Sequence, residues 1–555
     1  MISWQLGVRA ESGVHVITEP GTNAGLTLRT GGTGLSAGDG DFWIEVTAGE
    51  HQVDLDYLVV TFPAEVELGD LVWLNGYQSW SESAVRPLGR GRRPLFSPAR
   101  LLKLHLIGDD VIAPAQRNRR AEVSHEVLAA QPSSATGAPG ARLWASRLGS
   151  DAFTILEVSA GSIRAVIDVA GWRLAAGESA RIAWLEARTG DTAPHLLRDW
   201  AGSLATAREV PAITGWTSWY RYYTDIDAER LSAEIDALAA SEIRFDVFQI
   251  DDGFQAQIGD WLDPNPGFPN GVAPLAKQAR DAGMLPGLWI APFIVSKHSA
   301  VSREHPDWVL RDRRGRRVPA GWNPAWKGDY WLLDLELPEV QHHLAEVFRT
   351  ARDDWGFGLF KLDFLFAAAL DDRPGATRAQ RMRRAMELLR EWCGDAVILG
   401  CGVPLVSAAG LVDYCRVGAD VEARWESPLR LLNYRERAST VSALRSTLAR
   451  SWMDGTWFGI DPDVVILRTT DTRLDDTERR ALFTMNSALG SLVFVSDDVV
   501  GYDGETARLL GTWDPPGAAR VLAHTQVSGV DQVVTDRGVL SARLGRDGGW
   551  VRVDG

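Results

Sequence analysis

The sequence has few of the features that mark several large classes of protein. Only three cysteines occur among its 555 residues, at Cys393, Cys401 and Cys415, and no two of them have CxxC spacing. An odd, scattered set argues against a disulfide framework or a zinc ribbon, and it suits a reducing compartment. No apolar run approaches the roughly 18 residues that cross a bilayer, so we expect no membrane span and no membrane partner.

Signals for export and for nucleic acid binding are also missing. The N-terminal stretch has no charged segment followed by an apolar one, so we predict no secretory signal and expect the cytoplasm as the location. The net charge of −15 argues against a nucleic acid partner, which needs a basic face. Two short basic clusters, 90–94 and 311–318, contain glycine or proline. We interpret them as solvated turns, with an anionic-ligand site as the alternative.

Metal-binding patterns are scarce as well. The chain has ten histidines, but no HxH or HExxH pair occurs. The stretch DPDVV at 461–465 begins like a calcium loop but lacks the glycine and the glutamate that complete one. We therefore expect no metal and no other cofactor.

Tryptophan, in contrast, is abundant, with 23 residues. Its flat ring can fill a hydrophobic core, and it can also stack on the apolar face of a sugar. The composition leaves both interpretations open.

The pattern of apolar residues predicts three parts. Residues 1–205 read as short alternating strands separated by glycine and proline, which favours an N-terminal β-sandwich domain. From 206 to 500 strands alternate with helical patterns, which predicts a catalytic (β/α)8 TIM barrel, with a doubly wound sheet as the alternative. Residues 501–555 are strand-like again and predict a small C-terminal antiparallel β domain. The eight strands expected in the barrel are 212–219, 245–251, 285–293, 357–365, 396–403, 414–420, 456–464 and 491–497.

Polar side chains recur at the carboxyl ends of these expected strands, where (β/α)8 barrels carry their active residues. A cap or a turn explains one or two aspartates, but six consecutive strands ending in this way favour a carboxylate-lined pocket. The residues, in strand order, are Asp251 and Asp252, Trp289, Lys361 and Asp363, Cys401, Arg416 and Asp420, and Asp461 and Asp463.

The fourth expected strand contains a charged pair in an apolar run, GLFKLDFLF at 358–366. Strand alternation places Lys361 and Asp363 on one face, and Phe360 and Phe364 on the other. If the phenylalanines pack against the helices, the charged pair points into the barrel mouth. An ammonium beside Asp363 would favour the ionised carboxylate that a nucleophile requires. The alternative is a structural ion pair inside the barrel.

Several inward carboxylates, many tryptophans and few histidines favour glycoside hydrolysis. That reaction uses two carboxyl groups, one ionised and one protonated, on either side of a sugar ring.

Seven stretches, in this order and spacing, resemble glycoside hydrolase family 36, the retaining α-galactosidases of the melibiase type, and in particular their short prokaryotic branch. The resemblance covers about residues 70–500. The stretches are NGYQSWSES (75–83), GWTSWYRYY (215–223), FQIDDGFQAQIGDW (248–261), GLWIAPF (287–293), FKLDF (360–364), GCGVP (400–404) and RVGADV (416–421).

The resemblance implies a role for each matching residue. Asp363 is the implied nucleophile, which forms a covalent galactosyl-enzyme, and Asp420 is the implied general acid and then base. Asp251 and Asp252 would bind the O4 and O6 hydroxyls of galactose. The other implied substrate-binding residues are Lys361 and Arg416 on ring hydroxyls, Cys401 near the sugar, and Trp80, Trp219, Tyr220 and Trp289 around the pocket.

The expected function is therefore hydrolysis of terminal α-galactose from small oligosaccharides of the melibiose and raffinose type. An α-N-acetylgalactosaminidase, a galactosyltransferase on the same fold and a non-catalytic sugar-binding protein stay open as alternatives. The expected partner is the oligosaccharide itself. The resemblance also leaves room for a homo-oligomer, since relatives are often oligomeric.

Overall fold

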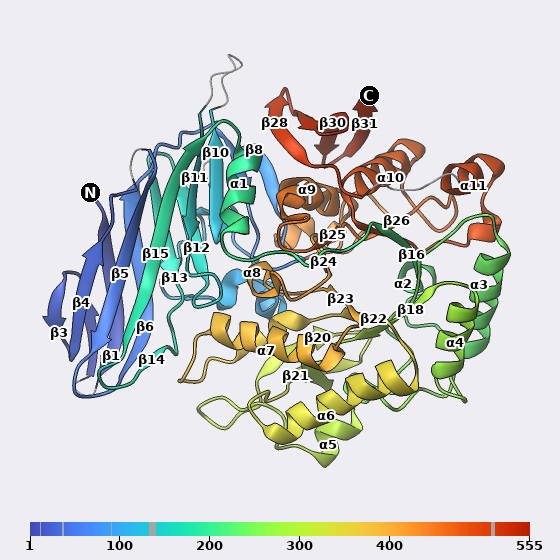
Figure 1. Cartoon of the computed structure of the whole chain (residues 1–555), viewed down its shortest axis with the longest axis horizontal. Helices are drawn as coiled ribbons and strands as arrows, with labels where there is room; N and C mark the ends of the chain where they lie inside the picture. Colours follow the sequence, from blue (N-terminus) through green and yellow to red (C-terminus); the bar gives the residue numbers. More distant parts are fainter. Residues whose placement is uncertain (11–12, 36–37, 90, 133–139, 512–516, 555) are drawn as a thin grey trace.

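The computed structural model describes residues 1–555 apart from 11–12, 36–37, 90, 133–139, 512–516 and 555. Figure 1 shows two layers of antiparallel strands at the N-terminal side, a barrel wrapped by helices beside them, and a small sheet near the C-terminus. The helices are α1 (Ala193–Gly202), α2 (Trp219–Tyr222), α3 (Ala228–Ala240), α4 (Ala273–Asp281), α5 (Ala300–Glu304), α6 (Pro338–Arg349), α7 (Arg378–Cys393), α8 (Leu405–Ala408), α9 (Thr440–Arg450), α10 (Asp476–Leu489) and α11 (Gly504–Gly511).

The N-terminal strands form two sheets that pack face to face. Strand β5 shows why, because Phe42, Ile44, Val46 and Ala48 alternate along it and all are buried. One sheet contains β1 (Ser3–Ala10), β2 (Gly13–Ile17), β6 (Val53–Pro63), β9 (Glu122–His125), β12 (Thr154–Ser159), β13 (Ser162–Ile167) and β14 (Arg173–Leu174). The other contains β3 (Gly21–Asn23), β4 (Leu26–Gly31), β5 (Gly40–Ala48), β7 (Leu71–Leu74), β8 (Ala84–Pro87), β10 (Val127–Gln131), β11 (Ala141–Ser146) and β15 (Ser179–Gly190).

The next strands are all parallel and close into a barrel, since the first, β16, pairs with the last, β27. This closure confirms the predicted TIM barrel and excludes the doubly wound sheet, whose edges stay open. The strands are β16 (Ile213–Thr217), β17 (Val247–Ile250), β18 (Leu285–Ile290), β22 (Leu359–Leu362), β23 (Val397–Gly400), β24 (Tyr414–Arg416), β25 (Gly459–Asp461), β26 (Val464–Val465) and β27 (Leu492–Val495).

The seventh barrel strand is split into β25 and β26. Pro462 has no N–H to donate to a ladder, and Asp463 has a positive φ of 80°. Strand β25 pairs with β24 and β26 pairs with β27, so the two halves together bridge the sixth and eighth strands.

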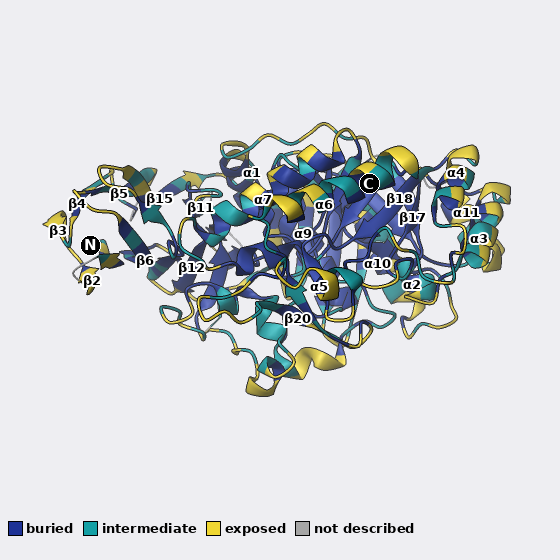
Figure 2. Cartoon of the chain, turned by 90° about the horizontal axis from the view of Figure 1, so that it is seen from below, coloured by how far each residue is buried: buried dark blue, intermediate teal, exposed yellow. Residues whose placement is uncertain are grey.

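Helices cover the outside of the barrel, so its strands are buried on both faces (Figure 2). The crossover after β23 is an exception, because its helix α8 has only four residues. The connection between β18 and α6 is long and carries its own antiparallel sheet, with β19 (Ile294–Ser296), β20 (Pro319–Asn323) and β21 (Gly328–Leu332).

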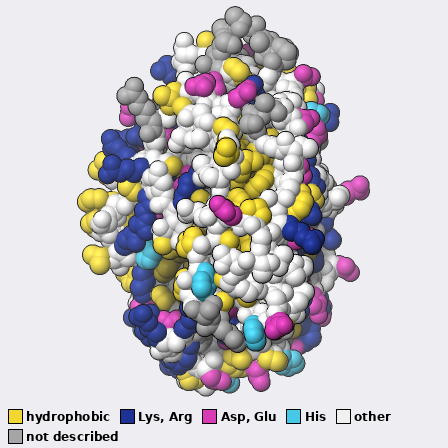
Figure 3. All heavy atoms as spheres, turned by 90° about the vertical axis from the view of Figure 1, so that its left-hand side faces the viewer, with side chains coloured by type: hydrophobic (Ala, Val, Ile, Leu, Met, Phe, Trp, Pro, Cys, Tyr) yellow, Lys and Arg dark blue, Asp and Glu magenta, His cyan; other side chains and the backbone are white. Residues whose placement is uncertain are grey.

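The last part of the chain forms an antiparallel four-stranded sheet that packs against α9 and α10. Its strands are β28 (Val521–Val527), β29 (Val530–Thr535), β30 (Gly538–Gly545) and β31 (Gly548–Asp554). We keep the boundaries near residues 205 and 500 as a proposal. Acidic, basic and apolar side chains are interspersed on the sandwich end of the molecule (Figure 3). In the part of the chain that the structure describes, no helix is both long and apolar enough to span a bilayer.

Candidate active site

A pocket of about 260 Å³ lies at the carboxyl ends of the barrel strands. Five carboxylates and one lysine share it with aromatic side chains, so we call it the carboxylate pocket. Its lining consists of Trp80, Leu104, Ile107, Trp219, Asp251, Asp252, Trp289, Trp322, Asn323, Trp326, Tyr330, Lys361, Asp363, Phe364, Asp420, Tyr434, Glu436 and Ala438.

Asp363 lies directly after β22 and is held by two donors. The indole Nε1 of Trp289 donates to one carboxylate oxygen at 3.0 Å, and the backbone N–H of Phe364 donates to the other at 2.9 Å. Burial raises the pKa of Asp363, and Lys361 and the Trp289 hydrogen bond partly offset that effect. The donors fix the carboxylate in one orientation toward the pocket.

The sequence left open an ion pair between Lys361 and Asp363. In the structure, Lys361 pairs with another carboxylate. Its Nζ lies 2.7 Å from the Oδ2 of Asp251, which follows β17, and β18 lies between that strand and β22. Burial disfavours the ammonium, but Asp251, Cys401 and Asp363 together outweigh burial, and the pKa of Lys361 is raised. The charge of Lys361 does lower the pKa of Asp363, as the sequence led us to expect, but burial is the larger effect and the net shift is upward.

Among the carboxylates of this pocket, Asp252 has the most clearly shifted pKa. Burial, together with Asp251 and Asp363, raises its pKa to about 6, although hydrogen bonds from Trp326 and Gln255 oppose the change. These donors lie 2.8 Å and 2.6 Å from its two oxygens. Asp252 is thus rigidly held and gains or loses its proton close to neutral pH.

Asp420 belongs to a cluster of three carboxylates around one guanidinium. Arg416, which ends β24, reaches Asp420 at 3.0 Å, Asp461 at 3.1 Å and Asp463 at 2.8 Å. Asp461 and Asp463 are fully buried, whereas the Asp420 side chain is 45% exposed toward the pocket. One cation cannot neutralise three anions. Burial and the neighbouring carboxylates accordingly raise the pKa of Asp463 to about 7, so the cluster holds a proton near neutral pH.

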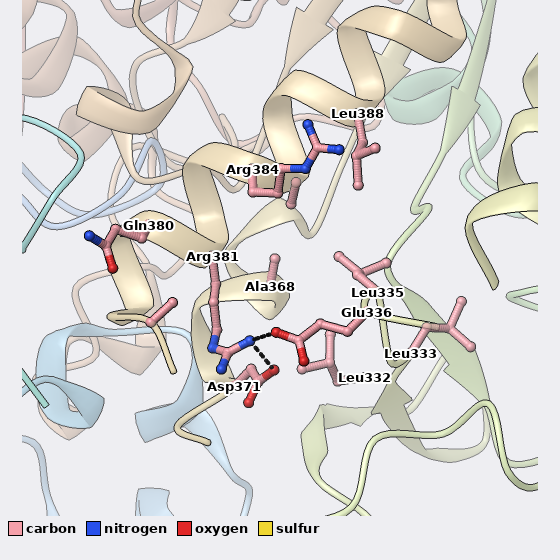
Figure 4. Close-up of a pocket in the computed structure, with 12 residues that line it drawn as sticks. Leu332, Leu333, Leu335, Glu336, Ala368, Asp371, Gln380, Arg381, Arg384 and Leu388 are labelled. Carbon is pink, nitrogen blue, oxygen red and sulfur yellow. Dashed lines mark hydrogen bonds and ion pairs between the residues drawn. The ribbon is translucent and has the colours of Figure 1, made fainter. Parts of the chain in front are cut away.

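A second cavity, of about 320 Å³, lies between the end of β21 and α7 (Figure 4). Leucine and alanine side chains form much of its wall, and its two carboxylates, Glu336 and Asp371, are both paired with Arg381. Among the described residues of its lining, no carboxylate is left unpaired for acid–base chemistry, so the carboxylate pocket is the better candidate for an active site.

Comparison with known proteins agrees with this choice. The profile of the family described as Melibiase matches residues 201–364. A curated sequence, probable α-galactosidase C of Aspergillus flavus, is 29% identical over 230 residues, which make up 37% of this chain and 28% of that protein. The chain thus matches less than a third of the length of this relative.

Solved structures extend the likeness over almost the whole chain. TtGalA, an α-galactosidase from Thermus thermophilus solved in complex with p-nitrophenyl α-D-galactopyranoside, is 30% identical, with a TM-score of 0.72 over 95% of this chain and 97% of that one. A second structure of TtGalA is a complex with stachyose. AgaA of Geobacillus stearothermophilus, described as a GH36 α-galactosidase, is 17% identical with a TM-score of 0.60, which is a likeness of fold alone.

The chain belongs to glycoside hydrolase family 36. The resemblance drawn from the seven sequence motifs is confirmed.

Eight of the eleven residues predicted for the family 36 site line the carboxylate pocket. The other three, Tyr220, Cys401 and Arg416, are buried just behind it. The Tyr220 hydroxyl donates to Asp463, and the Cys401 sulfur accepts from the Trp80 indole at 3.1 Å. The eight lining residues are Trp80, Trp219, Asp251, Asp252, Trp289, Lys361, Asp363 and Asp420.

Phe364 corrects the strand reading of FKLDF. Strand β22 ends at Leu362, and Phe364 adopts a left-handed backbone with φ of 55°. Phe360 does pack outward against Phe348 of α6, but Phe364 turns into the pocket and packs against Trp80 and Trp326. Alternation applies only while the chain stays extended, which is why the prediction failed one residue past the strand.

Several pocket residues of this family 36 chain were missed at the sequence level. Trp322, Trp326 and Tyr330 come from the sheet between β18 and α6, and Tyr434 and Glu436 from the segment before α9. The aromatic run GWNPAWKGDYW at 321–331, in an unusually long connection after a barrel strand, was the available signal.

Replacing Asp252 by asparagine should change how stability depends on pH. A folded pKa of about 6, above the ordinary 3.8, means that the folded state binds this proton more tightly than the unfolded state. The contribution of Asp252 to the free energy of unfolding therefore falls by about 3 kcal/mol as pH rises from about 4 to about 6. Asp252→Asn should raise Tm relative to the wild type at pH 7.5 but not at pH 4.

Thermal unfolding at both pH values checks this expectation. The exposed Asp372→Asn variant serves as the control and should show the same Tm difference at each pH. An Asp252→Asn difference that does not change with pH would contradict the assignment.

Proposed function

We propose that this chain hydrolyses terminal α-D-galactosyl residues of small oligosaccharides of the melibiose and raffinose type, with retention of configuration. The observation that carries the proposal is the carboxylate pocket, in which Asp363 and Asp420 face one aromatic-walled space at the carboxyl ends of barrel strands. That the family 36 relative TtGalA is seen with an α-galactoside and with stachyose supports the substrate class.

The reaction takes place in two displacements. In the first, a carboxylate oxygen of Asp363 attacks the anomeric carbon while Asp420 donates a proton to the departing glycosidic oxygen. In the second, Asp420 takes a proton from water, and the water oxygen displaces Asp363 from that carbon. Both carboxyl groups return to their starting states.

The surroundings of the two carboxyl groups suit these opposite roles. The Trp289 and Phe364 N–H groups donate to Asp363, which favours its anionic form. Asp420 shares Arg416 with two further carboxylates, and that cluster retains a proton near neutral pH. Asp251, Asp252 and Lys361 supply the acceptors and the donor for the sugar hydroxyls.

A panel of nitrophenyl glycosides, with α-galactose, α-N-acetylgalactosamine and β-L-arabinopyranose, tests the substrate. We expect kcat/KM to be highest for the α-galactoside. Proton NMR of the first product formed should show the α anomer, and products formed with a concentrated sugar acceptor would reveal a galactosyltransferase. Release of the β anomer first, or no turnover of any of the three, would contradict the proposal.

Lys361→Met removes a buried cation that lowers the pKa of Asp363. The acid limb of the kcat/KM profile reports ionisation of the nucleophile, so we expect it to move to higher pH and kcat/KM at pH 7 to fall by about 100-fold. Because the variant leaves Asp251 buried without its partner, it should also lose about 3–5 kcal/mol of stability.

The double variant Lys361→Met/Asp251→Asn is the control for that loss. It should regain stability because no buried charge is left unpaired, yet keep the shifted acid limb. A folded single variant with an unchanged acid limb would show that Lys361 does not act on Asp363.

The location and assembly of the protein are also proposals. We propose a cytoplasmic enzyme, on the grounds of its few, scattered cysteines. We further propose that it forms a homo-oligomer, which light scattering of the purified chain would test.

A further inference from the structure

A cavity of about 530 Å³, in the size range of small-ligand pockets, lies outside the carboxylate pocket. Its walls come from β7 and β8 of the sandwich, the segment before α9, α9 itself, and the turn between β30 and β31. These elements lie side by side where the three parts of the molecule meet (Figure 1). Because seven arginines line it, we call it the arginine cavity: Arg86, Arg92, Arg93, Arg430, Arg435, Arg445 and Arg546.

The arginine cavity concentrates positive charge in a chain whose net charge is −15. Among the described residues that line it, the carboxylates are Glu82 and Glu122. Glu122 lies 2.6 Å from Arg86, and Glu82 lies 3.7 Å from Arg445. Two of the seven guanidiniums are therefore neutralised within the cavity, and five are not.

Two of those five share a single carboxylate behind the wall. Arg92 and Arg435 both contact Asp109, which also binds Arg117 at 3.1 Å. Burial, Arg435 and Arg117 lower the pKa of Arg92 to about 10, although Asp109 opposes them. The Nε of Arg92 is buried and has no hydrogen-bond partner among the described residues. The positive charge of Arg92 is thus undercompensated, whereas Asp109, Glu436 and Asp110 together outweigh burial at Arg435 and raise its pKa.

The remaining three arginines are Arg93, Arg430 and Arg546. Within the described part of the chain, no carboxylate lies within 4 Å of any of their guanidinium groups. All three are exposed at the cavity, so they are free to bind a ligand. Unpaired guanidiniums that converge on one cavity match the geometry by which arginine forks bind phosphate oxygens.

We propose that the arginine cavity binds a small phosphate-bearing anion. The basic cluster at 90–94 then has a use beyond a solvated turn, since Arg92 and Arg93 belong to this wall. The chain supplies guanidinium groups from three distant regions, and only the folded molecule brings them together.

The wall between the two sites is the segment 433–436. Asn433 and Arg435 line the arginine cavity, whereas Tyr434 and Glu436 line the carboxylate pocket. Alternate residues of this segment thus line the arginine cavity and the carboxylate pocket. A bound anion would be separated from the sugar site by this single segment of chain. This binding does not depend on the proposed glycosidase activity.

Isothermal titration calorimetry of the full chain tests the proposal with three probes: inorganic phosphate, pyrophosphate and glucose 6-phosphate. Potassium chloride at matched ionic strength is the control for simple screening. We expect saturable binding of at least one probe with one site per chain, and no saturable signal with chloride. A preference for the two inorganic probes would assign the site to free phosphate, and a preference for the sugar phosphate would assign it to a phosphate ester.

A charge-matched pair of variants locates the site. Arg93→Gln/Arg430→Gln should weaken binding of the best probe at least tenfold, as expected when two charge-assisted contacts are lost. Arg313→Gln/Arg314→Gln removes the same charge from an exposed turn elsewhere and should bind as the wild type does. Arg546→Gln provides an independent check from the C-terminal sheet, with weaker binding expected.

The proposal would be overturned by no saturable binding of any probe, by equal effects of chloride, or by wild-type affinity in the Arg93→Gln/Arg430→Gln variant. Turnover of α-galactosides is measured separately on the same samples. A protein that binds the probe but cleaves no galactoside would leave this inference standing and reject the proposed function.

Discussion

Asp363→Ala should lower kcat on α-galactosides by about 10⁴-fold or more, because it removes the atom that forms the bond to the sugar. The variant should still fold, since it removes a buried carboxylate whose pKa is raised by burial rather than one that stabilises the core. Steady-state kinetics with a nitrophenyl α-galactoside, together with a Tm measurement, would check both expectations.

Rescue of the Asp363→Ala variant by azide tests the role of Asp363 more specifically than loss of activity does. The space left by the Asp363 carboxylate lies on the face of the sugar opposite the leaving group, so azide entering there should restore turnover and yield the β-galactosyl azide. Asp372→Ala, an exposed aspartate nine positions along the chain, should keep wild-type activity and gain nothing from azide. An Asp363→Ala enzyme with full activity, or an α-azide product, would remove Asp363 from its role.

Asp420→Ala should produce a different defect, because it removes the proton donor and leaves the nucleophile in place. With a nitrophenyl leaving group, which needs little protonation, the first step should survive, and the galactosyl-enzyme should accumulate as a burst. With melibiose or raffinose, kcat/KM should fall by roughly 10²–10⁴-fold, the usual contribution of a general acid. Stopped-flow measurement of the burst and assays with melibiose and raffinose separate the two steps.

The azide product again identifies the residue. Azide can occupy the space of the missing Asp420 on the side from which water attacks, so this variant should give the α-galactosyl azide. The basic limb of the pH profile should also disappear in Asp420→Asn. Equal losses on nitrophenyl galactoside and melibiose, or an unchanged basic limb, would mean that another group transfers the proton.

The barrel could be predicted from the sequence because its signals are local. A short apolar run flanked by helical periodicity identifies a strand without knowledge of its neighbours, and each of the eight expected strands coincides with an observed one. The split of the seventh strand at Pro462 was the main local deviation, and proline is the residue that explains it.

The carboxylate pocket could be predicted in outline for a similar reason. Parallel strands bring their carboxyl ends to one rim, so Asp251, Trp289 and Asp363 had to meet there once the barrel was assumed. The long connection after β18 follows no such rule. Its Trp326 binds Asp252 because a separate small sheet folds back over the rim, and no spacing in the sequence sets that path.

By itself, the sequence determined the order of strands and helices, the face of each strand and the carboxylates available at the rim, because each of these depends on neighbours a few residues apart. Only the tertiary structure decided that Lys361 pairs with Asp251 rather than Asp363, that Arg416 serves three carboxylates, and that arginines from three regions surround one cavity. Electrostatic energy depends on distance in space and on burial, and both are set when residues far apart in the chain are brought into contact.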